Sequence, residues 1–174
     1  AQEGLALMAS RGFHQLLVVR DGELAGIVTE RDLFSLQRVT MRSITQAVRQ
    51  ARDVTALQRI VADIAALTDN LVAQGAAAEP LTHTITALND SLTQRLFELL
   101  LPRFQLDDVA WCWLAVGSEG RREQTVATDQ DNAIVFECDE RDVADTRARL
   151  LLFAGAANER LAELGFPLCT GNIM

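Results

Sequence analysis

Two aspartates separated by one residue follow a glycine-containing turn and an arginine pair in the second half of the chain. Asp129 and Asp131 stand directly before an apolar run. In an extended segment their Cα atoms would lie about 7 Å apart and their side chains would point to one side. Two such carboxylates can hold one or two hard cations, and Mg²⁺ commonly adds water and phosphate oxygens to a pair of carboxylates. The pair therefore predicts a one- or two-metal magnesium site that receives a phosphate-bearing substrate.

The turn before the aspartates has residue types that bind phosphate. Gly117 lets the backbone approach a phosphate closely, and the Ser118 hydroxyl with nearby backbone N–H groups can donate to its oxygens. This donation is strongest if residues 118–124 open a helix. Arg121 and Arg122 can clamp the remaining negative charge in bidentate fashion. We therefore predict a phosphate-binding turn beside the metal site.

Three other uses of these residue types do not fit the sequence. A calcium-binding EF-hand loop needs an oxygen ligand and a glycine where Ala133 and Ile134 stand. A serine-hydrolase elbow needs a glycine at the position of Val116, and both histidines of the chain precede Ser118. A P-loop needs a lysine, and the sequence has none. The alternative that stays open is an ordinary turn followed by aspartates that cap and solvate the end of a strand.

Strands and a long helix are expected on either side of this segment. Residues 109–116 form a short, nearly uninterrupted apolar run typical of a strand buried on both faces, and residues 133–136 predict a second buried strand. Residues 141–164 carry the apolar stripe of a helix, and residues 165–169 are expected to begin a third strand. This order predicts an α/β unit over residues 105–174.

Helices are predicted for the preceding segment, residues 39–104. Ser43 is a candidate N-cap for a short helix, and Asp53 is one for the long amphipathic helix that follows. Gly75 ends that helix and Pro80 begins the next, which gives an antiparallel helical hairpin. The hairpin could carry a signal between domains, but apolar stripes of this kind more often serve only to form the hydrophobic core.

The central segment, WLAVGSEGRREQTVATDQDNAIVF, resembles the nucleotidyltransferase superfamily typified by DNA polymerase beta. That superfamily has a Gly-Ser turn, a short helix with arginine, and Asp-x-Asp at the next strand. A closer resemblance, over about residues 40 to 174, is to a nucleotidyltransferase family related to the PII-protein uridylyltransferases and commonly fused to CBS domains. It implies Mg²⁺-dependent transfer of UMP or AMP, from UTP or ATP, to a small molecule or a protein such as a PII-like protein.

The resemblance also implies a role for each matching residue. Gly117, Ser118 and Arg121 would hold the β and γ phosphates, and Asp129 and Asp131 would hold the metals. The superfamily uses a third carboxylate on a later strand, and the resemblance does not place it in this chain.

The first 38 residues contain GFHQLLVVRDGELAGIVTERDLF, which resembles the second half of a CBS repeat, a module that works in pairs and often senses adenine nucleotides. Residues 16–19 are expected to form a buried strand, joined by a hairpin turn to a second strand that leads into a helix. The resemblance implies that Thr29 and Asp32 contact phosphate and ribose. The alternative is that Thr29 only caps the helix and Asp32 is solvated. The edge of a half repeat also predicts a homodimer or docking to a partner repeat.

Composition limits the possible partners. The net charge is −8, and residues 105–174 carry six arginines against thirteen acidic residues, which disfavours binding to a nucleic-acid backbone. No apolar stretch approaches the roughly 20 residues that cross a bilayer, so we expect a cytoplasmic protein without a membrane segment. Cys112, Cys138 and Cys169 lie in apolar stretches and predict buried free thiols rather than disulfides or a zinc site.

These observations predict an α/β (α+β) chain in three parts. They are a partial CBS domain at residues 1–38, a helical linker or bundle at 39–104, and the N-terminal part of a nucleotidyltransferase domain at 105–174. The function we expect is that of a bacterial-type signalling nucleotidyltransferase regulated by nucleotide sensing at the CBS piece. The alternative is a catalytically inactive module that binds a nucleotide or a protein. Because the chain opens in the middle of a helical pattern, we also expect a fragment of a longer protein.

Overall fold

The chain divides into two compact units, Ala1–Val39 and Thr40–Met174. A computed structural model describes the residues 7–8, 11–29, 40–73, 75–124 and 129–169. None of the helices in these ranges is long and apolar enough to cross a membrane.

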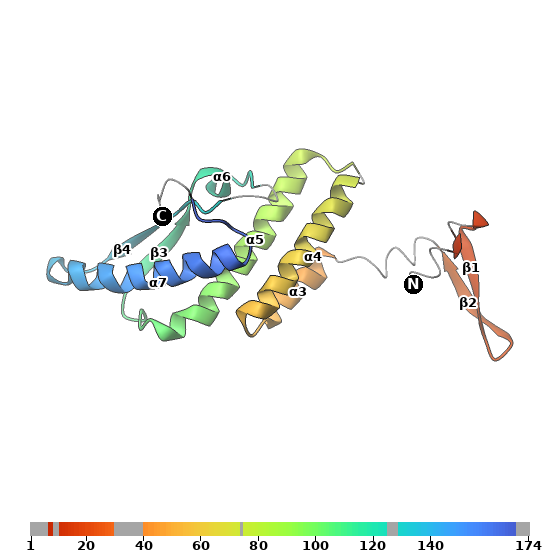
Figure 1. Ribbon diagram of the computed structural model, residues 1–174, viewed down its shortest axis with the longest axis horizontal. Coiled ribbons are helices and arrows are strands. Elements are labelled where there is room, and N and C mark those ends of the chain that lie inside the picture. The colour runs from red at the N-terminus through yellow and green to blue at the C-terminus, as the bar shows by residue number, and fades with distance from the viewer. Residues whose placement is uncertain (1–6, 9–10, 30–39, 74, 125–128, 170–174) are drawn as a thin grey trace. The chain divides into compact units, whose positions relative to one another are not determined.

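The first unit contains an antiparallel hairpin of β1 (Gln15–Arg20) and β2 (Glu23–Thr29) (Figure 1). Asp21 and Gly22 form its turn with φ values of 54° and 84°. Two successive positive φ values give the two-residue turn whose twist matches that of paired strands, and Asp-Gly is a preferred sequence for it. The predicted hairpin is therefore confirmed.

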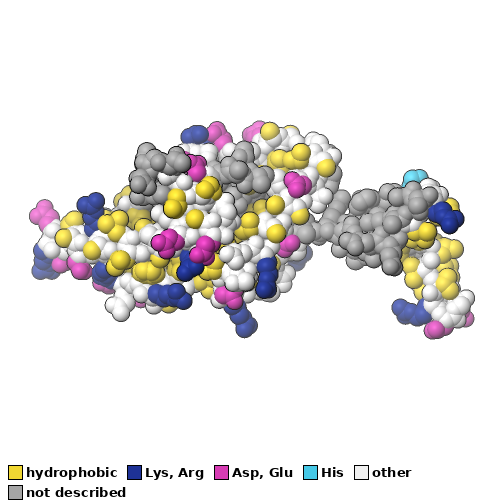
Figure 2. All heavy atoms as spheres, viewed as in Figure 1, with side chains coloured by type: hydrophobic (Ala, Val, Ile, Leu, Met, Phe, Trp, Pro, Cys, Tyr) yellow, Lys and Arg dark blue, Asp and Glu magenta, His cyan; other side chains and the backbone are white. Residues whose placement is uncertain are grey.

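The burial predicted for residues 16–19 is wrong. Apolar side chains of both strands are exposed, and Figure 2 shows them along the hairpin in yellow. The most exposed of these side chains are those of Leu17, Val19, Leu24 and Ile27. The physical reason is that no second layer among the described residues covers the face that carries Leu17 and Ile27, whereas Leu16 and Val28 on the other face are half-buried. Thr29 is the last residue of β2, whereas Asp32 and the helix predicted around it lie outside the described residues.

The second unit begins with three helices, α3 (Met41–Gln50), α4 (Val54–Ala73) and α5 (Ala78–Leu100). Thr40 is the N-cap of α3, and Ser43 at position N3 completes a capping box with it. The predicted N-cap at Ser43 is therefore wrong, because the helix begins three residues earlier than predicted. Asp53 caps α4 as predicted, since its Oδ1 accepts the backbone N–H of Ala56 at 2.7 Å.

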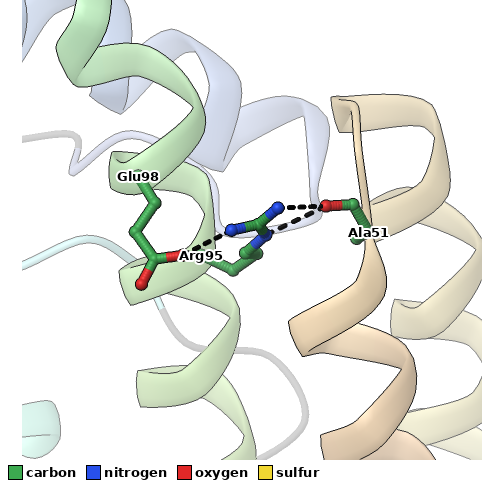
Figure 3. A network of polar contacts seen from close by, with 3 residues as sticks. All are labelled: Ala51, Arg95 and Glu98. Carbon is green, nitrogen blue, oxygen red and sulfur yellow. Dashed lines mark hydrogen bonds and ion pairs between the residues drawn. The ribbon is translucent and has the colours of Figure 1, made fainter.

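The three helices pack against one another through their apolar stripes. Arg95 on α5 adds a polar connection to the C-terminal end of α3 (Figure 3). Its Nε and Nη2 atoms donate to the Ala51 carbonyl at 2.9 and 2.8 Å, and Nη1 donates to Glu98 at 2.5 Å. This guanidinium satisfies a carbonyl that the end of a helix leaves without an intrahelical partner.

The remainder of the unit combines two strands with one long helix. The elements after α5 are η1 (Leu101–Arg103), β3 (Ala110–Ala115), α6 (Gly117–Gly120), β4 (Asn132–Glu137), η2 (Glu140–Asp142) and α7 (Val143–Glu163). β3 and β4 pair antiparallel, with Trp111 opposite Phe136 and Trp113 opposite Ile134. The mixed α/β class predicted from the sequence is therefore confirmed.

An aromatic cluster joins α7 to the hairpin. Phe153 of α7 is 0% exposed, and its ring centroid lies 5.2 Å from that of Trp111 and 6.2 Å from that of Trp113. Phe97 of α5 and Phe104 contact the same ring at 5.4 and 5.5 Å. Edge-to-face contacts of this kind add to the stabilisation from burying the rings. They fix the strand that leads into the Gly-Ser turn.

Two predictions of burial in this unit are wrong. The strands are covered on one face only: Cys112 and Leu114 are exposed, and Val135 is 57% exposed. The reason is that the aromatic rings of α5 and α7 cover a single face of the hairpin. The cysteines are free, but Cys112 and Cys138 are exposed and Cys169 is half-buried, so burial of the three thiols is also wrong.

Residues 165–169 form no strand in the structure. One backbone hydrogen bond joins them to the segment before β4: the Gln130 N–H donates to the Pro167 carbonyl at 3.0 Å. A single such bond aligns the segment without continuing the sheet.

Candidate functional site

The turn after β3 lies directly beside the aspartate pair. The Val116 N–H donates to the Asp131 carbonyl at 2.9 Å. Gly117 follows with φ +56°, and a Cβ atom built on it would lie 2.1 Å from Asp131 Oδ2. A side chain at position 117 is therefore excluded both by the backbone conformation and by the carboxylate. The residue that Gly117 approaches within the chain is Asp131, and the approach to a phosphate stays a prediction.

A second glycine of the turn has a packing role that the sequence analysis missed. A Cβ atom on Gly120 would lie 2.6 Å from the Ala115 carbonyl oxygen. The Gly120 N–H donates to the Val116 carbonyl at 3.0 Å, which closes the single turn of α6 against the end of β3. The repeated glycine in Gly-Ser-Glu-Gly was the available signal for this contact.

The two aspartates precede β4 rather than lie in it, because the strand begins at Asn132. Asp129 is exposed and Asp131 is half-buried. One carboxylate oxygen from each and the Cys169 thiol all lie within 4.8 Å of one another. Two carboxylates this close fit a divalent cation that prefers oxygen ligands. The structure thus brings together the two predicted metal ligands and adds a thiol that the sequence analysis did not include.

The other predicted phosphate ligands lie at or just after α6. Ser118 is half-buried, and its carbonyl accepts the Glu123 N–H at 2.9 Å. Arg121 is exposed and its Nε donates to Glu123 at 2.8 Å, so this guanidinium has a carboxylate partner within the turn. Arg122 adopts a positive φ of 58°. The helix spans four residues, which is shorter than the helix considered over residues 118–124.

A half-buried carboxyl group stands next to the aspartates. Burial, together with the negative charges of Asp90 and Asp131, raises the pKa of Glu119 to about 7. Burial also raises the pKa of Asp90 on α5, against the opposing effect of the Arg122 guanidinium. Acidic groups from α5, α6 and the loop before β4 therefore act on one another, and a cation placed among them would relieve the repulsion.

The raised pKa of Glu119 predicts a specific pH dependence of stability. The folded chain keeps this proton up to about pH 7, whereas the unfolded chain loses it near 4.5, so the free energy of unfolding falls as pH rises through this window. The Glu119→Gln variant should not show this decrease. Near pH 8 its free energy of unfolding should be about 1 kcal/mol higher than that of the wild type, a difference that is already reduced to allow for the partial solvent exposure of the side chain. Urea unfolding between pH 5 and 8 measures the difference.

The matched control for this measurement is Glu140→Gln, at an exposed position in η2. It should reproduce the wild-type pH profile. An identical pH profile for Glu119→Gln and the wild type would contradict the assignment to Glu119.

Buried amide side chains hold the loop before β4 in place. Gln130 is 3% exposed, and its Nε2 donates to the carbonyls of Asn158 and Phe166 at 3.0 and 2.7 Å. Asn132 Nδ2 donates to Asn158 Oδ1 at 3.2 Å. The sequence analysis missed these residues, because a single polar residue within an apolar stripe does not reveal its partner on a distant segment.

A cavity of about 10 Å³ lies beside this network, with room for roughly one water molecule. Glu119, Asp129 and Gln130 are among its lining residues. Within the described part of the chain, Gln130 Oε1 is buried and accepts no hydrogen bond. A buried oxygen without a donor is costly, so a polar group in this cavity would be stabilising.

The second unit is an α/β unit in which a pair of carboxylates lies against a glycine turn. The chain belongs to the family described as "Putative nucleotidyltransferase DUF294", which matches residues 62–174, more than half of its length. The CBS domain family matches residues 1–38. No curated protein and no solved structure matches the chain. Both matches agree with the resemblances expected from the motifs of these regions.

Proposed function

We propose that the second unit catalyses Mg²⁺-dependent transfer of a nucleoside monophosphate from an NTP to an acceptor. The observation that carries the proposal is the contact between the positive-φ Gly117 and the carboxylate of Asp131, with the Asp129 carboxylate close by. This arrangement supports the proposal, because a glycine turn of the kind that can bind phosphate lies beside two carboxylates that can hold a metal. The nucleotidyltransferase family match supports the same reaction class.

In this proposal each residue acts on charge or orientation. Asp129 and Asp131 would hold Mg²⁺, which when bound would neutralise charge on the triphosphate. Gly117 lets the turn lie against the Asp131 carboxylate, and the Ser118 hydroxyl would donate to a phosphate oxygen. In the reaction an acceptor oxygen forms a bond to the α-phosphorus, the bond to the pyrophosphate leaving group breaks, and the acceptor proton passes to a base.

The substrate proposed is UTP or ATP, and the acceptor class includes a PII-like protein as well as small molecules. The test is incorporation of label from α-labelled UTP or ATP by the full-length protein, with Mg²⁺ or with EDTA. The acceptor is supplied as a cell extract. Asp129→Asn and Asp131→Asn should each lower Mg²⁺-dependent incorporation by about 100-fold or more, because each removes charge from the metal ligands.

The matched control is Asp142→Asn, an exposed carboxylate in η2. Its incorporation should stay within about twofold of the wild type, as expected for a surface change away from the site. Equal incorporation by the wild type and Asp131→Asn would contradict the proposed metal role.

A second candidate is a regulatory module that binds a nucleotide without turning it over. It is favoured by one observation: Arg121, an expected phosphate ligand, forms an ion pair with Glu123. The two functions differ in one measurable respect. The regulatory module would bind Mg²⁺ and NTP yet show no incorporation in the extract that supplies the acceptor.

We further propose that the CBS piece pairs with another repeat, in a homodimer or from the same protein, and senses an adenine nucleotide through Thr29 and Asp32. The exposed apolar side chains of β1 and β2 support pairing, because a large exposed apolar surface of this kind is typical of an interaction site. Light scattering tests pairing in a homodimer, and calorimetric titration with AMP or ATP tests the sensing. A strictly monomeric species would contradict the homodimer, and the absence of heat of binding with either nucleotide would contradict the sensing.

A further inference from the structure

We propose that Asp129, Asp131 and Cys169 form a binding site for a thiophilic divalent cation of the Zn²⁺ class. This use of the carboxylate pair differs from Mg²⁺-nucleotide binding, because it recruits a sulfur ligand. The proposed zinc site shares Asp129 and Asp131 with the proposed magnesium site, but zinc binding does not require nucleotidyl transfer.

The three ligand groups lie close enough for one ion. Their nearest oxygen and sulfur atoms all lie within 4.8 Å of one another. In a tetrahedral zinc site with Zn–S of about 2.3 Å and Zn–O of about 2.1 Å, oxygen and sulfur ligands lie about 3.5 Å apart. A small rotation of the exposed Asp129 side chain and the half-buried Cys169 side chain would bring the atoms to this spacing.

Gln130 anchors the segment that carries Cys169. Its backbone N–H donates to the Pro167 carbonyl at 3.0 Å, and its side chain donates to the Phe166 carbonyl at 2.7 Å. The Phe166 N–H in turn donates to the Leu161 carbonyl at the end of α7 at 3.0 Å. Cys169 therefore lies two residues after Pro167, which Gln130 holds in place. Gln130 itself stands between the two aspartates.

The buried amide oxygen of Gln130 supplies a second, independent indication of a ligand. This atom accepts no hydrogen bond among the described residues and belongs to a residue that is 3% exposed. Gln130 and Asp129 both line the cavity of about 10 Å³, which has room for one water molecule. Of the three proposed ligands, Asp129 alone lines this cavity, and a water in it that also bound a cation at Asp129 would donate to Gln130 Oε1.

The chemistry of the three ligands favours Zn²⁺ over Mg²⁺. Thiolate sulfur suits zinc and related cations, whereas Mg²⁺ prefers oxygen ligands. On binding, the metal–sulfur bond forms, the S–H bond breaks, and the proton passes to the buffer. Two carboxylates and one thiolate then surround a divalent ion. A zinc ion held in this way would compete with Mg²⁺ for Asp129 and Asp131.

The test uses Co²⁺, a spectroscopic substitute for Zn²⁺, added to the reduced full chain without nucleotide. The expected result is a saturable thiolate-to-cobalt charge-transfer band with one ion bound per chain, which excess Zn²⁺ removes. Cys169→Ser should abolish the band, and Asp129→Asn should weaken binding about tenfold or more. Cys112→Ser, which removes an exposed cysteine of β3, is the matched control and should retain the band.

Several outcomes would overturn the proposal. They are the absence of a saturable band in the wild type, a band that persists in Cys169→Ser, full affinity in Asp129→Asn, and equal loss in Cys112→Ser. The spectroscopic result does not depend on catalysis, so it can fail while Mg²⁺-dependent transfer succeeds, and the reverse.

Discussion

Gly117→Ala is expected to lower Mg²⁺-dependent nucleotide incorporation by about 100-fold or more. The new Cβ atom would stand 2.1 Å from Asp131 Oδ2, so the carboxylate must move by more than an ångström to restore normal contact. Displacements of about 1 Å at a reacting centre commonly cost about 100-fold in rate. The positive φ of 56° adds about 1–2 kcal/mol of backbone strain for any residue with a Cβ atom. Incorporation and urea unfolding, measured on the same preparation, separate the two effects.

Gly75→Ala is the control that separates backbone strain from the collision. Gly75 has a similar φ of +75°, and a Cβ atom there would meet nothing within 4 Å. This variant should lose about 1 kcal/mol of stability through strain alone. Its incorporation should equal that of the wild type. Normal incorporation by Gly117→Ala, or an equal loss in Gly75→Ala, would contradict a specific role for the glycine at the aspartate pair.

Phe153→Ala should produce the largest loss of stability, about 3–5 kcal/mol, because it removes a fully buried ring and leaves a cavity. Phe153 contacts both tryptophans of the chain, Trp111 and Trp113. Their fluorescence therefore reports on unfolding of this region. A loss of this size is a large fraction of the total stability of a typical domain. In urea, the fluorescence transition should move to a much lower midpoint.

Leu152→Ala tests whether burial, rather than helix content, causes this loss. Leu152 precedes Phe153 in α7 and is 69% exposed. Its replacement should change the free energy of unfolding by no more than about 0.5 kcal/mol. Similar midpoints for the two variants would contradict the central place of Phe153 in the core.

The helices and the first hairpin could be predicted because their signals are local. Apolar stripes, the Asp53 cap and the turn at Asp21 and Gly22 each depend on residues close together in the chain. Burial was harder to predict, because an apolar run indicates apolar residues without indicating how many layers cover them. Val135 lies in such a run, yet α5 and α7 cover only the opposite face of its strand.

The site could be predicted only in part, for a related reason. The Gly-Ser turn and the aspartates lie in one short stretch, so their proximity follows from one turn. Gln130, Asn158 and Cys169 meet through contacts between distant segments, as in the bond from Gln130 to the Asn158 carbonyl. No periodicity in the sequence encodes such a contact. The position of the Cys169 thiol beside the aspartates could therefore not be predicted from the apolar stretch in which this cysteine lies.

The most direct test of a metal–nucleotide site at Asp129 and Asp131 is calorimetric titration of the full-length protein with UTP and with ATP, in Mg²⁺ and in EDTA. At least one nucleotide should bind saturably in Mg²⁺, with about one site per chain outside the CBS piece. Asp131→Asn should weaken this binding by about tenfold or more, because the metal loses a charged ligand. Equal affinity in EDTA, or in Asp131→Asn, would contradict a metal–nucleotide site at Asp129 and Asp131.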